Sequence, residues 1–183
     1  MTAPEEVHRY GRHAEHSAPI NGSADQVFDH LDDPTRLTEH MSTRSWKLGW
    51  GRMETVLDGQ GGRAIGSHIV VRGRAFGLRL ALEEVVTSRL PPLTKTWETV
   101  GEPRLLVIGP YRMGFTLTPA GAGVDLLVAI DYGLPPKGIP WLLGRLLGRL
   151  YATWCTRRMV RDAQHAFGPS PAAAYPLNEG AIK

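Results

Sequence analysis

The part of the sequence that most constrains the fold is residues 138–167, GIPWLLGRLLGRLYATWCTRRMVRDAQHAF. At about 100° per residue, a helix places the large apolar side chains of this stretch on one broad face. They are Leu142, Leu143, Leu146, Leu147, Leu150, Tyr151 and Trp154. The opposite, usually solvated side carries Arg145, Arg149, Ala152 and Thr156. Pro140 suits the first turn, and Gly168 followed by Pro169 is a common stop. The stretch therefore predicts one long helix that packs its leucine face onto a sheet built by the preceding chain.

Two other roles for this helix have to be weighed. A transmembrane span needs roughly 20 mostly apolar residues, and Arg145 and Arg149 interrupt the apolar run, which argues against a span. An interfacial helix stays open, because apolar residues backed by arginines also suit a membrane surface. Arg157 and Arg161 continue the leucine face. Either the helix outruns the sheet there or its packing face rotates, or one arginine lies at a cavity entrance and pairs with an anionic ligand group.

The residues before this helix change from helical to strand-like periodicity. Ser23 and Gln26 form a capping box that starts one short helix, and Asp33 with Pro34 starts a second that runs to about Met41. Alternating apolar residues then predict successive strands with short, hairpin-like connections. The predicted strands are 10–20, 46–57, 64–72, 76–89, 94–100, 104–118 and 124–132. Together they predict an α+β fold, a curved antiparallel sheet of about seven strands wrapped around the long C-terminal helix, with two short helices after the first strand.

Length and composition bound the organisation and the partners. A chain of 183 residues fits one domain, for which we expect residues 10–168, with residues 1–9 a disordered N-terminus and 169–183 a disordered tail. Cys155 has no partner for an internal disulfide and no secretory signal pattern opens the chain, so a cytoplasmic protein is expected. The net charge of +3 without a dense basic run predicts no nucleic-acid partner. A monomer or a homodimer is expected.

Three segments resemble the START/Bet v 1-like superfamily, also called SRPBCC. They are INGSADQVFDHLDDP, LEEVVTSRLPP and FTLTPAGAGVDLLVAIDYGLP. The likeness covers about residues 10 to 167, and Val124 is a mild departure where the family often has Thr in the last hairpin. The resemblance implies a helix-grip fold with a deep apolar cavity that holds a hydrophobic small molecule. It implies no shared catalytic motif, because members include lipid carriers, hormone receptors and polyketide cyclases.

Polar candidates for chemistry are few. No nucleophile elbow, zinc motif or phosphate loop is present, and GQGGR at 59–63 is interpreted as a hairpin turn. The spacing of His13 and His16 places them on opposite faces of a strand, so no metal or other cofactor is expected. Weak catalytic candidates are Asp131, Glu98, Tyr111 and Arg112. For Asp131 the alternation favours a solvated outer face, since Ile130 and Tyr132 point inward.

The leading hypothesis is binding or carriage of a lipid-, polyketide- or aromatic-like molecule without chemistry. Its predicted lining combines sheet and helix residues. They are Phe76, Leu78, Leu80, Trp97, Tyr111, Met113, Phe115, Leu143, Leu147, Leu150, Tyr151 and Trp154. One alternative is a metal-independent polyketide aromatase/cyclase- or dehydratase-like (lyase) enzyme that uses one or two polar cavity residues. Another is a protein whose long helix docks a partner or a membrane surface.

Overall fold

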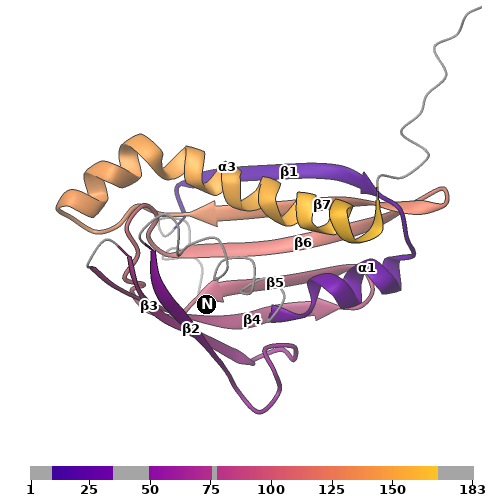
Figure 1. Cartoon of the computed structure of the whole chain (residues 1–183), viewed down its shortest axis with the longest axis horizontal. Helices are drawn as coiled ribbons and strands as arrows, with labels where there is room; N and C mark the ends of the chain where they lie inside the picture. The colour runs from indigo at the N-terminus through magenta and orange to yellow at the C-terminus, as the bar shows by residue number, and fades with distance from the viewer. Residues whose placement is uncertain (1–9, 35–49, 76–77, 169–183) are drawn as a thin grey trace, which may run out of the picture.

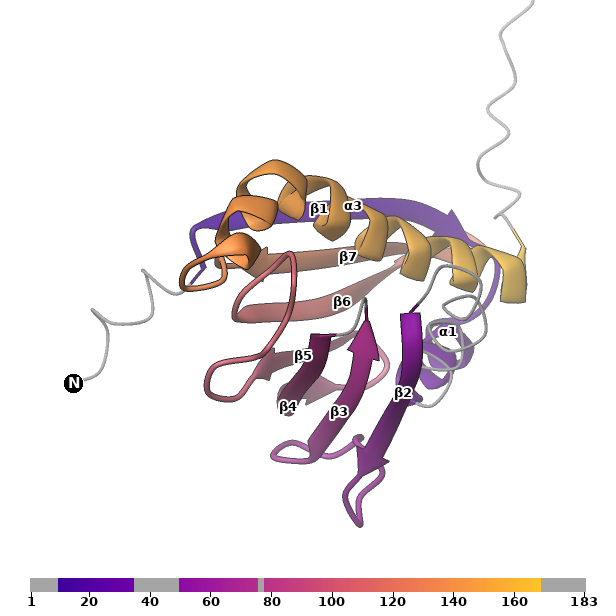
Figure 2. The ribbon, with the colours of Figure 1, turned by 60° about the vertical axis from the view of Figure 1, so that its left-hand side comes forward.

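The computed structural model describes residues 10–34, 50–75 and 78–168. In this part of the chain, seven antiparallel strands form one sheet in the order β1-β7-β6-β5-β4-β3-β2. The strands are β1 (Arg12–Ile20), β2 (Trp50–Leu57), β3 (His68–Ala75), β4 (Leu78–Leu90), β5 (Thr94–Thr99), β6 (Tyr111–Ala120) and β7 (Gly123–Tyr132). The helices are α1 (Ala24–Leu31) and α3 (Ile139–Phe167). The sheet is curved, and α3 lies along its β1–β7 side (Figures 1 and 2), so the predicted fold class is confirmed.

Strict alternation in β7 explains which face of the sheet is buried. Val124, Leu126, Val128, Ile130 and Tyr132 are all buried, whereas Asp125 and Leu127 between them are exposed. Successive side chains of a strand point to opposite faces, so every second residue of β7 enters the core on the concave side. Phe115 on β6 continues this core and meets Phe28 of α1 edge to face at 5.5 Å between ring centroids.

The short helix α1 begins at the predicted capping box, in which Ser23 and the Gln26 side chain satisfy each other's backbone N–H groups. At its other end Asp32 is buried and accepts hydrogen bonds from two cations. Lys95 Nζ lies 2.6 Å from one carboxylate oxygen, and Arg89 Nη2 lies 2.8 Å from the other. A buried carboxylate is tolerated when it is paired in this way. The pairs therefore tie α1 to β4 and β5.

The long helix is confirmed, but its predicted packing face is wrong. The buried residues of α3 are small or lie in its second half, namely Gly144, Gly148, Ala152, Thr156, Met159, Val160 and Ala163. Ala152 and Thr156, expected in solvent, are fully buried, whereas Leu146 is 67% exposed and Leu150 68%. Glycine lets the helix approach closely: a Cβ on Gly144 would lie 2.9 Å from the Val107 carbonyl oxygen. The helix therefore packs its small residues, chiefly onto β1 and β7.

Other boundaries differ locally from the prediction. The predicted strand 104–118 is a strand only from Tyr111, and the residues before it are irregular apart from a bridge between Arg104 and Ala81. The 59–63 segment is a turn between β2 and β3, as predicted, and the Asp58 carboxylate accepts hydrogen bonds from the N–H groups of Gln60, Gly62 and His68. The predicted second short helix lies almost wholly in residues outside the described ranges. No helix among the described residues is long and apolar enough to span a membrane.

Candidate ligand-binding site

A polar cluster lies on the inward face of the sheet, where β4, β5 and β6 run side by side. The Tyr111 hydroxyl donates a hydrogen bond to the Glu84 carboxylate, which also accepts one from the Trp97 indole N–H. Glu84 is opposite Thr99 in the β4–β5 register, and the Thr99 hydroxyl accepts the Tyr111 backbone N–H at 3.1 Å. A carboxyl group, a phenol and an indole are thus held together by three neighbouring strands.

The surroundings of this cluster favour neutral side chains. Burial is the largest effect on Glu84 and raises its pKa above the ordinary value, although the hydrogen bonds from Tyr111 and Trp97 and the charge of Lys95 oppose it. Burial, followed by the nearby Glu84 charge, raises the pKa of Tyr111 well above 10. Burial therefore favours the protonated, neutral form of both side chains.

Helix α3 contributes two more polar side chains on the edge of its packed face. Tyr151 and Cys155, one helical turn apart, are hydrogen-bonded to each other. Burial raises the pKa of the Cys155 thiol to about 12 and that of the Tyr151 phenol well above 10. The Glu84 charge adds to the rise at Tyr151, so the helix pair and the sheet cluster are close enough to interact. The raised pKa keeps the thiol protonated at neutral pH, and the protonated form is a poor nucleophile.

Several predicted lining residues are buried or partly buried. Leu80, Trp97, Tyr111 and Phe115 are buried, and Met113, Leu143 and Tyr151 are partly buried. Trp97 and Met113 are directly paired across β5 and β6, which places them on the same face as Tyr111, two residues along the strand. Phe76 and the side chain of Leu78 lie outside the described part of the structure. A role of these residues in ligand contact stays a prediction.

The outer half of the predicted helix lining has to be corrected. Leu150 and Trp154 are 68% and 53% exposed, on the side of α3 away from its packed small residues. Leu147 is 43% exposed and lies between the two sides. Arg157 and Arg161 are exposed, as are Leu150 and Trp154 of the face that they continue, so their position agrees with a helix side that faces solvent.

Three of the four catalytic candidates lie on the outer face of the sheet. The Asp131 side chain is half-exposed and hydrogen-bonded to His13, with 2.6 Å between its Oδ1 and the imidazole Nδ1. This hydrogen bond is the largest cause of the raised pKa of His13. Arg112 Nη2 lies 3.1 Å from Glu98 Oε2, and Tyr10 donates to the same oxygen at 3.4 Å. Only Tyr111 belongs to the inward cluster.

The carboxylate that does face inward, Glu84, was not among the predicted site residues. The sequence signal for Glu84 is its place in the alternation of β4. It is two residues from Leu82 and four from Leu80, so its side chain points to the same apolar face. The adjacent Glu83, in the opposite phase, lies 2.7 Å from His68 Nδ1 in a pair whose two side chains are half exposed. A pair of consecutive glutamates thus divides between the two faces.

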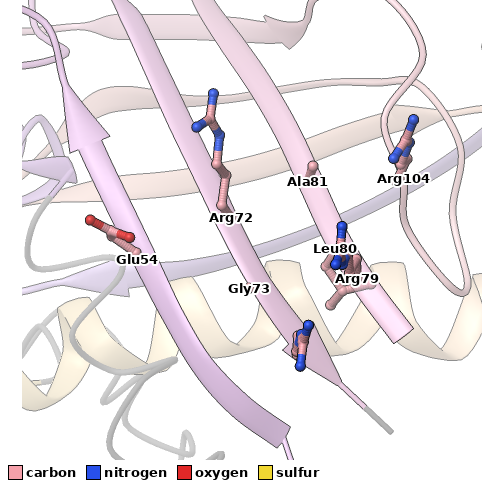
Figure 3. Close-up of a pocket in the computed structure, with 8 residues that line it drawn as sticks. Glu54, Arg72, Gly73, Arg79, Leu80, Ala81 and Arg104 are labelled. Carbon is pink, nitrogen blue, oxygen red and sulfur yellow. The ribbon is translucent and has the colours of Figure 1, made fainter. Parts of the chain in front are cut away.

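A second feature is an arginine-lined hollow of about 470 Å³ on the other face of β2, β3 and β4 (Figure 3). Glu54, Arg72 and Ala81 form a row across the three strands, and Arg104 extends it by its bridge to Ala81. Arg74 and Arg79, directly paired across β3 and β4, lie two residues further along. Alternation puts this charged row on the face opposite Glu84. Gly73 and Leu80 also line the hollow, but Glu84, Trp97 and Tyr111 do not.

Comparison with known proteins is consistent with this architecture. Residues 12–164 match the family described as "Polyketide cyclase / dehydrase and lipid transport", and the chain belongs to that family. Among curated protein sequences none matches the chain.

Solved structures share the fold at low sequence identity. A Chromobacterium violaceum protein is 15% identical with a TM-score of 0.57, covering 87% of this chain and 99% of that one. An aromatase/cyclase from Streptomyces sp. R1128 is 15% identical with a TM-score of 0.56, covering 84% of this chain and 94% of its own. Norcoclaurine synthase from Thalictrum flavum is 14% identical with a TM-score of 0.56, covering 83% and 89%. At such identities the likeness shows the fold, the helix-grip arrangement of a curved sheet and a long C-terminal helix.

Proposed function

We propose that this protein binds a hydrophobic small molecule against the concave face of the sheet, beside α3, with Glu84 and Tyr111 as its polar contact. The observation that carries the proposal is a hydrogen-bonded carboxyl–phenol pair among apolar side chains on the inward face. Binding sites for small molecules are mostly apolar with a few placed polar groups. Membership of a family named for polyketide cyclases and lipid transport points to the same class of ligand.

The packing of α3 is concentrated on the β1–β7 side of the sheet. The helix contacts β1 and β7, and the sheet curves away from it toward β2 (Figure 2). Leu82 and Glu84 on the inward phase of β4 remain partly accessible, even though their surroundings desolvate Glu84 enough to raise its pKa. A partly accessible carboxyl group that is nevertheless desolvated is the environment expected of a recessed site.

The chemistry of the pair indicates the kind of ligand. Apolar area contributes roughly 25 cal/mol per Å² removed from water, whereas a buried polar group costs free energy unless it finds a hydrogen-bond partner. A carboxyl group with a raised pKa can both donate and accept, and so can the Tyr111 hydroxyl. The ligand that fits is therefore a largely apolar molecule with a carbonyl or hydroxyl group.

The outer face of the sheet supplies a matched control for the experiment. Tyr10 and Glu98 form a tyrosine–glutamate hydrogen bond there, as Tyr111 and Glu84 do on the inward face. Native mass spectrometry of protein purified without detergent, followed by organic extraction, shows whether an apolar compound is bound. Nile red, a neutral polarity-sensitive dye, then measures binding by the emptied protein.

The expected result is a bound apolar compound and a dissociation constant for Nile red that Tyr111→Phe and Glu84→Gln change by about threefold or more, the value of roughly one hydrogen bond. Tyr10→Phe and Glu98→Gln leave it unchanged. An empty protein that does not bind the dye contradicts the proposal. So does an equal response of the inner and outer variants.

A catalytic role is the second candidate, and the raised pKa of Glu84 is the observation that favours it. A carboxyl group whose pKa is moved toward neutrality is suited to general acid–base work, and Tyr111 is placed to hand on a proton. Elimination of water from a β-hydroxy ketone needs one group to take the α-proton and another to protonate the leaving hydroxyl. Product analysis with such substrates tests this: a turnover that Glu84→Gln abolishes and Glu98→Gln preserves supports it, and unchanged substrate counts against it.

A further inference from the structure

The outer face of α3 is unusually apolar for a surface that nothing in the described residues covers. We define this outer face as Ile139, Leu142, Leu146, Leu147, Leu150 and Trp154, whose exposed fractions run from 43% to 75%. Helical spacing makes them contiguous over about 22 Å at 1.5 Å per residue. A contiguous exposed apolar patch of this kind marks an interaction site, whereas apolar residues scattered singly do not.

The orientation of this face is fixed by the opposite side of the helix. Gly144, Gly148 and Ala152 lie against the body of the protein, and a Cβ on Gly144 would meet Val107 and Pro135 at 2.9 Å. No larger side chain fits between helix and body at that position, so rotation of α3 to bury its leucines would require the body to move. The leucines therefore point outward because of tight packing on the other side.

The charge around the outer face has a single sign. From residue 137 to residue 161 the sequence contains no acidic residue and six cationic ones. They are Lys137, Arg145, Arg149, Arg157, Arg158 and Arg161. Arg158 is paired with Asp162 at 3.0 Å, whereas Arg145, Arg149, Arg157 and Arg161 have no ion pair with a described residue. Arg145 and Arg149 are exposed along one side of the apolar residues, and Arg157 and Arg161 follow them toward the C-terminus.

We propose that the outer face of α3 docks onto the surface of an anionic phospholipid bilayer. An apolar strip with flanking arginines and tryptophans is the composition of a helix that lies in the membrane interface, and tryptophan is favoured at the headgroup level. Trp154 lies near the C-terminal end of the strip and is 53% exposed, whereas Trp141, 38% exposed, lies near the other end on the side of Arg145, which stacks over its ring at 5.0 Å. A second copy of the chain fits less well, because neither copy offers an acidic residue in this stretch to balance the arginines of the other.

Docking would bring the inward cluster close to the lipid. Tyr151 and Cys155, on the cluster side of the helix, lie within one turn of Leu150 and Trp154 in the outer face. Nevertheless, the docking proposal does not rest on ligand binding, because exposure and charge alone carry it. Nile red binding measured without vesicles therefore separates failure of one proposal from failure of the other.

The test is co-sedimentation of the full chain with vesicles of phosphatidylcholine, with and without phosphatidylglycerol. Binding is expected only with the anionic lipid and is expected to weaken as salt is raised. Arg145→Glu/Arg149→Glu is expected to lower partitioning by about tenfold or more, since each basic residue near an anionic surface contributes roughly a fivefold change. The control Arg72→Glu/Arg104→Glu makes the same change of net charge in the hollow on the far face and is expected to have a much smaller effect.

The apolar contribution has its own matched pair of variants. Leu146→Gln/Leu150→Gln is expected to reduce partitioning by about tenfold, whereas Ile65→Gln/Leu90→Gln, at exposed positions away from α3, changes it little. Equal binding to neutral and anionic vesicles, or an equal loss in the hollow variant, overturns the proposal. A dimer in sedimentation velocity that Leu146→Gln/Leu150→Gln dissociates, with no binding to vesicles, assigns the face to a second copy and also overturns it.

Discussion

A simple amphipathic helix packs its large apolar residues against the protein, whereas α3 packs small residues and exposes large apolar ones. The side packed on the protein is lined in its first half by Gly144, Gly148 and Ala152, while the opposite side presents Leu146 and Leu150 to solvent. Small residues let two backbones approach closely, and the dispersion contacts of such an interface come from backbone and ring atoms of the neighbour. The difference teaches that size complementarity, and not side-chain hydrophobicity alone, fixed which side of this helix is buried.

The largest effect on stability is expected from a larger side chain on the packed side of α3. Gly144→Leu is expected to lower the free energy of unfolding by about 3 kcal/mol, because its Cβ would already lie 2.9 Å from Val107 and Pro135. Urea denaturation followed by circular dichroism measures the change. A stability equal to that of the wild type would mean that the helix does not lie against Val107.

Tyr151 and Cys155 lie between the two sides of α3, next to the Glu84 cluster. The pH dependence of the free energy of unfolding tests this region. Because burial raises the pKa of Glu84 above 4.5, the folded state binds more protons than the unfolded state between 4.5 and the raised value. The contribution of this group to the free energy of unfolding therefore falls as pH rises through that window and is constant above it.

Glu84→Gln removes this titration. The variant is expected to lack the decline with pH that the wild type shows, while Glu98→Gln on the outer face retains it. Urea midpoints across a pH series measure the difference between the two variants. Parallel pH profiles of the wild type and Glu84→Gln would contradict a raised pKa at this position.

A smaller substitution on the packed side is expected to lower the free energy of unfolding less. A Cβ on Gly148 would lie 3.4 Å from the Tyr132 ring and the Val107 carbonyl oxygen, a tight but tolerable contact. Gly148→Ala also gains up to about 1 kcal/mol of helix propensity, so the net change in unfolding free energy is expected to stay within about 1 kcal/mol. A thermal denaturation curve compared with that of Gly144→Leu checks the graded response. An equally large loss for both variants would show that Gly148 is as tightly enclosed as Gly144.

The smallest effect on stability is expected on the exposed side. Leu146→Gln changes a side chain that is 67% exposed, and such surface substitutions usually alter the free energy of unfolding by about 0.5 kcal/mol or less. Chemical denaturation measures it alongside the other variants. A loss of about 2 kcal/mol or more would place Leu146 in a packed core and reverse the comparison.

The sequence was sufficient for the sheet because strand alternation is a local pattern. In β7, Val124 to Tyr132 alternate with polar and exposed residues, and the short turns between strands limit the pairing to antiparallel neighbours. Phase along a strand also identifies Glu84 as an inward carboxylate, since it is in step with Leu80 and Leu82. Alternation within one strand does not identify the hydrogen-bond partners of Glu84, because Trp97 and Tyr111 come from other strands.

The helix face and the start of β6 were not predictable in the same way. Periodicity ranks leucine as more buried than glycine and has no information about how closely a neighbour approaches. Val107 and Pro135, which enforce that approach at Gly144, lie in connecting segments whose path depends on the assembled sheet. For the same reason the alternation of Leu105 and Val107 predicts part of a strand, although both residues lie in the irregular segment before β6.

The most direct measurement of the central claim, that α3 packs its small residues and exposes its large ones, is cysteine accessibility along the helix. Burial raises the pKa of Cys155 to about 12, so the wild-type chain supplies a slow-reacting background. Leu146→Cys and Leu150→Cys are predicted to react with a maleimide at least about tenfold faster than Ala152→Cys and Thr156→Cys, whose modification must wait for local opening of the structure. Fast reaction at 152 and 156 with protection at 146 and 150 would contradict the account, because it would place the leucines against the sheet.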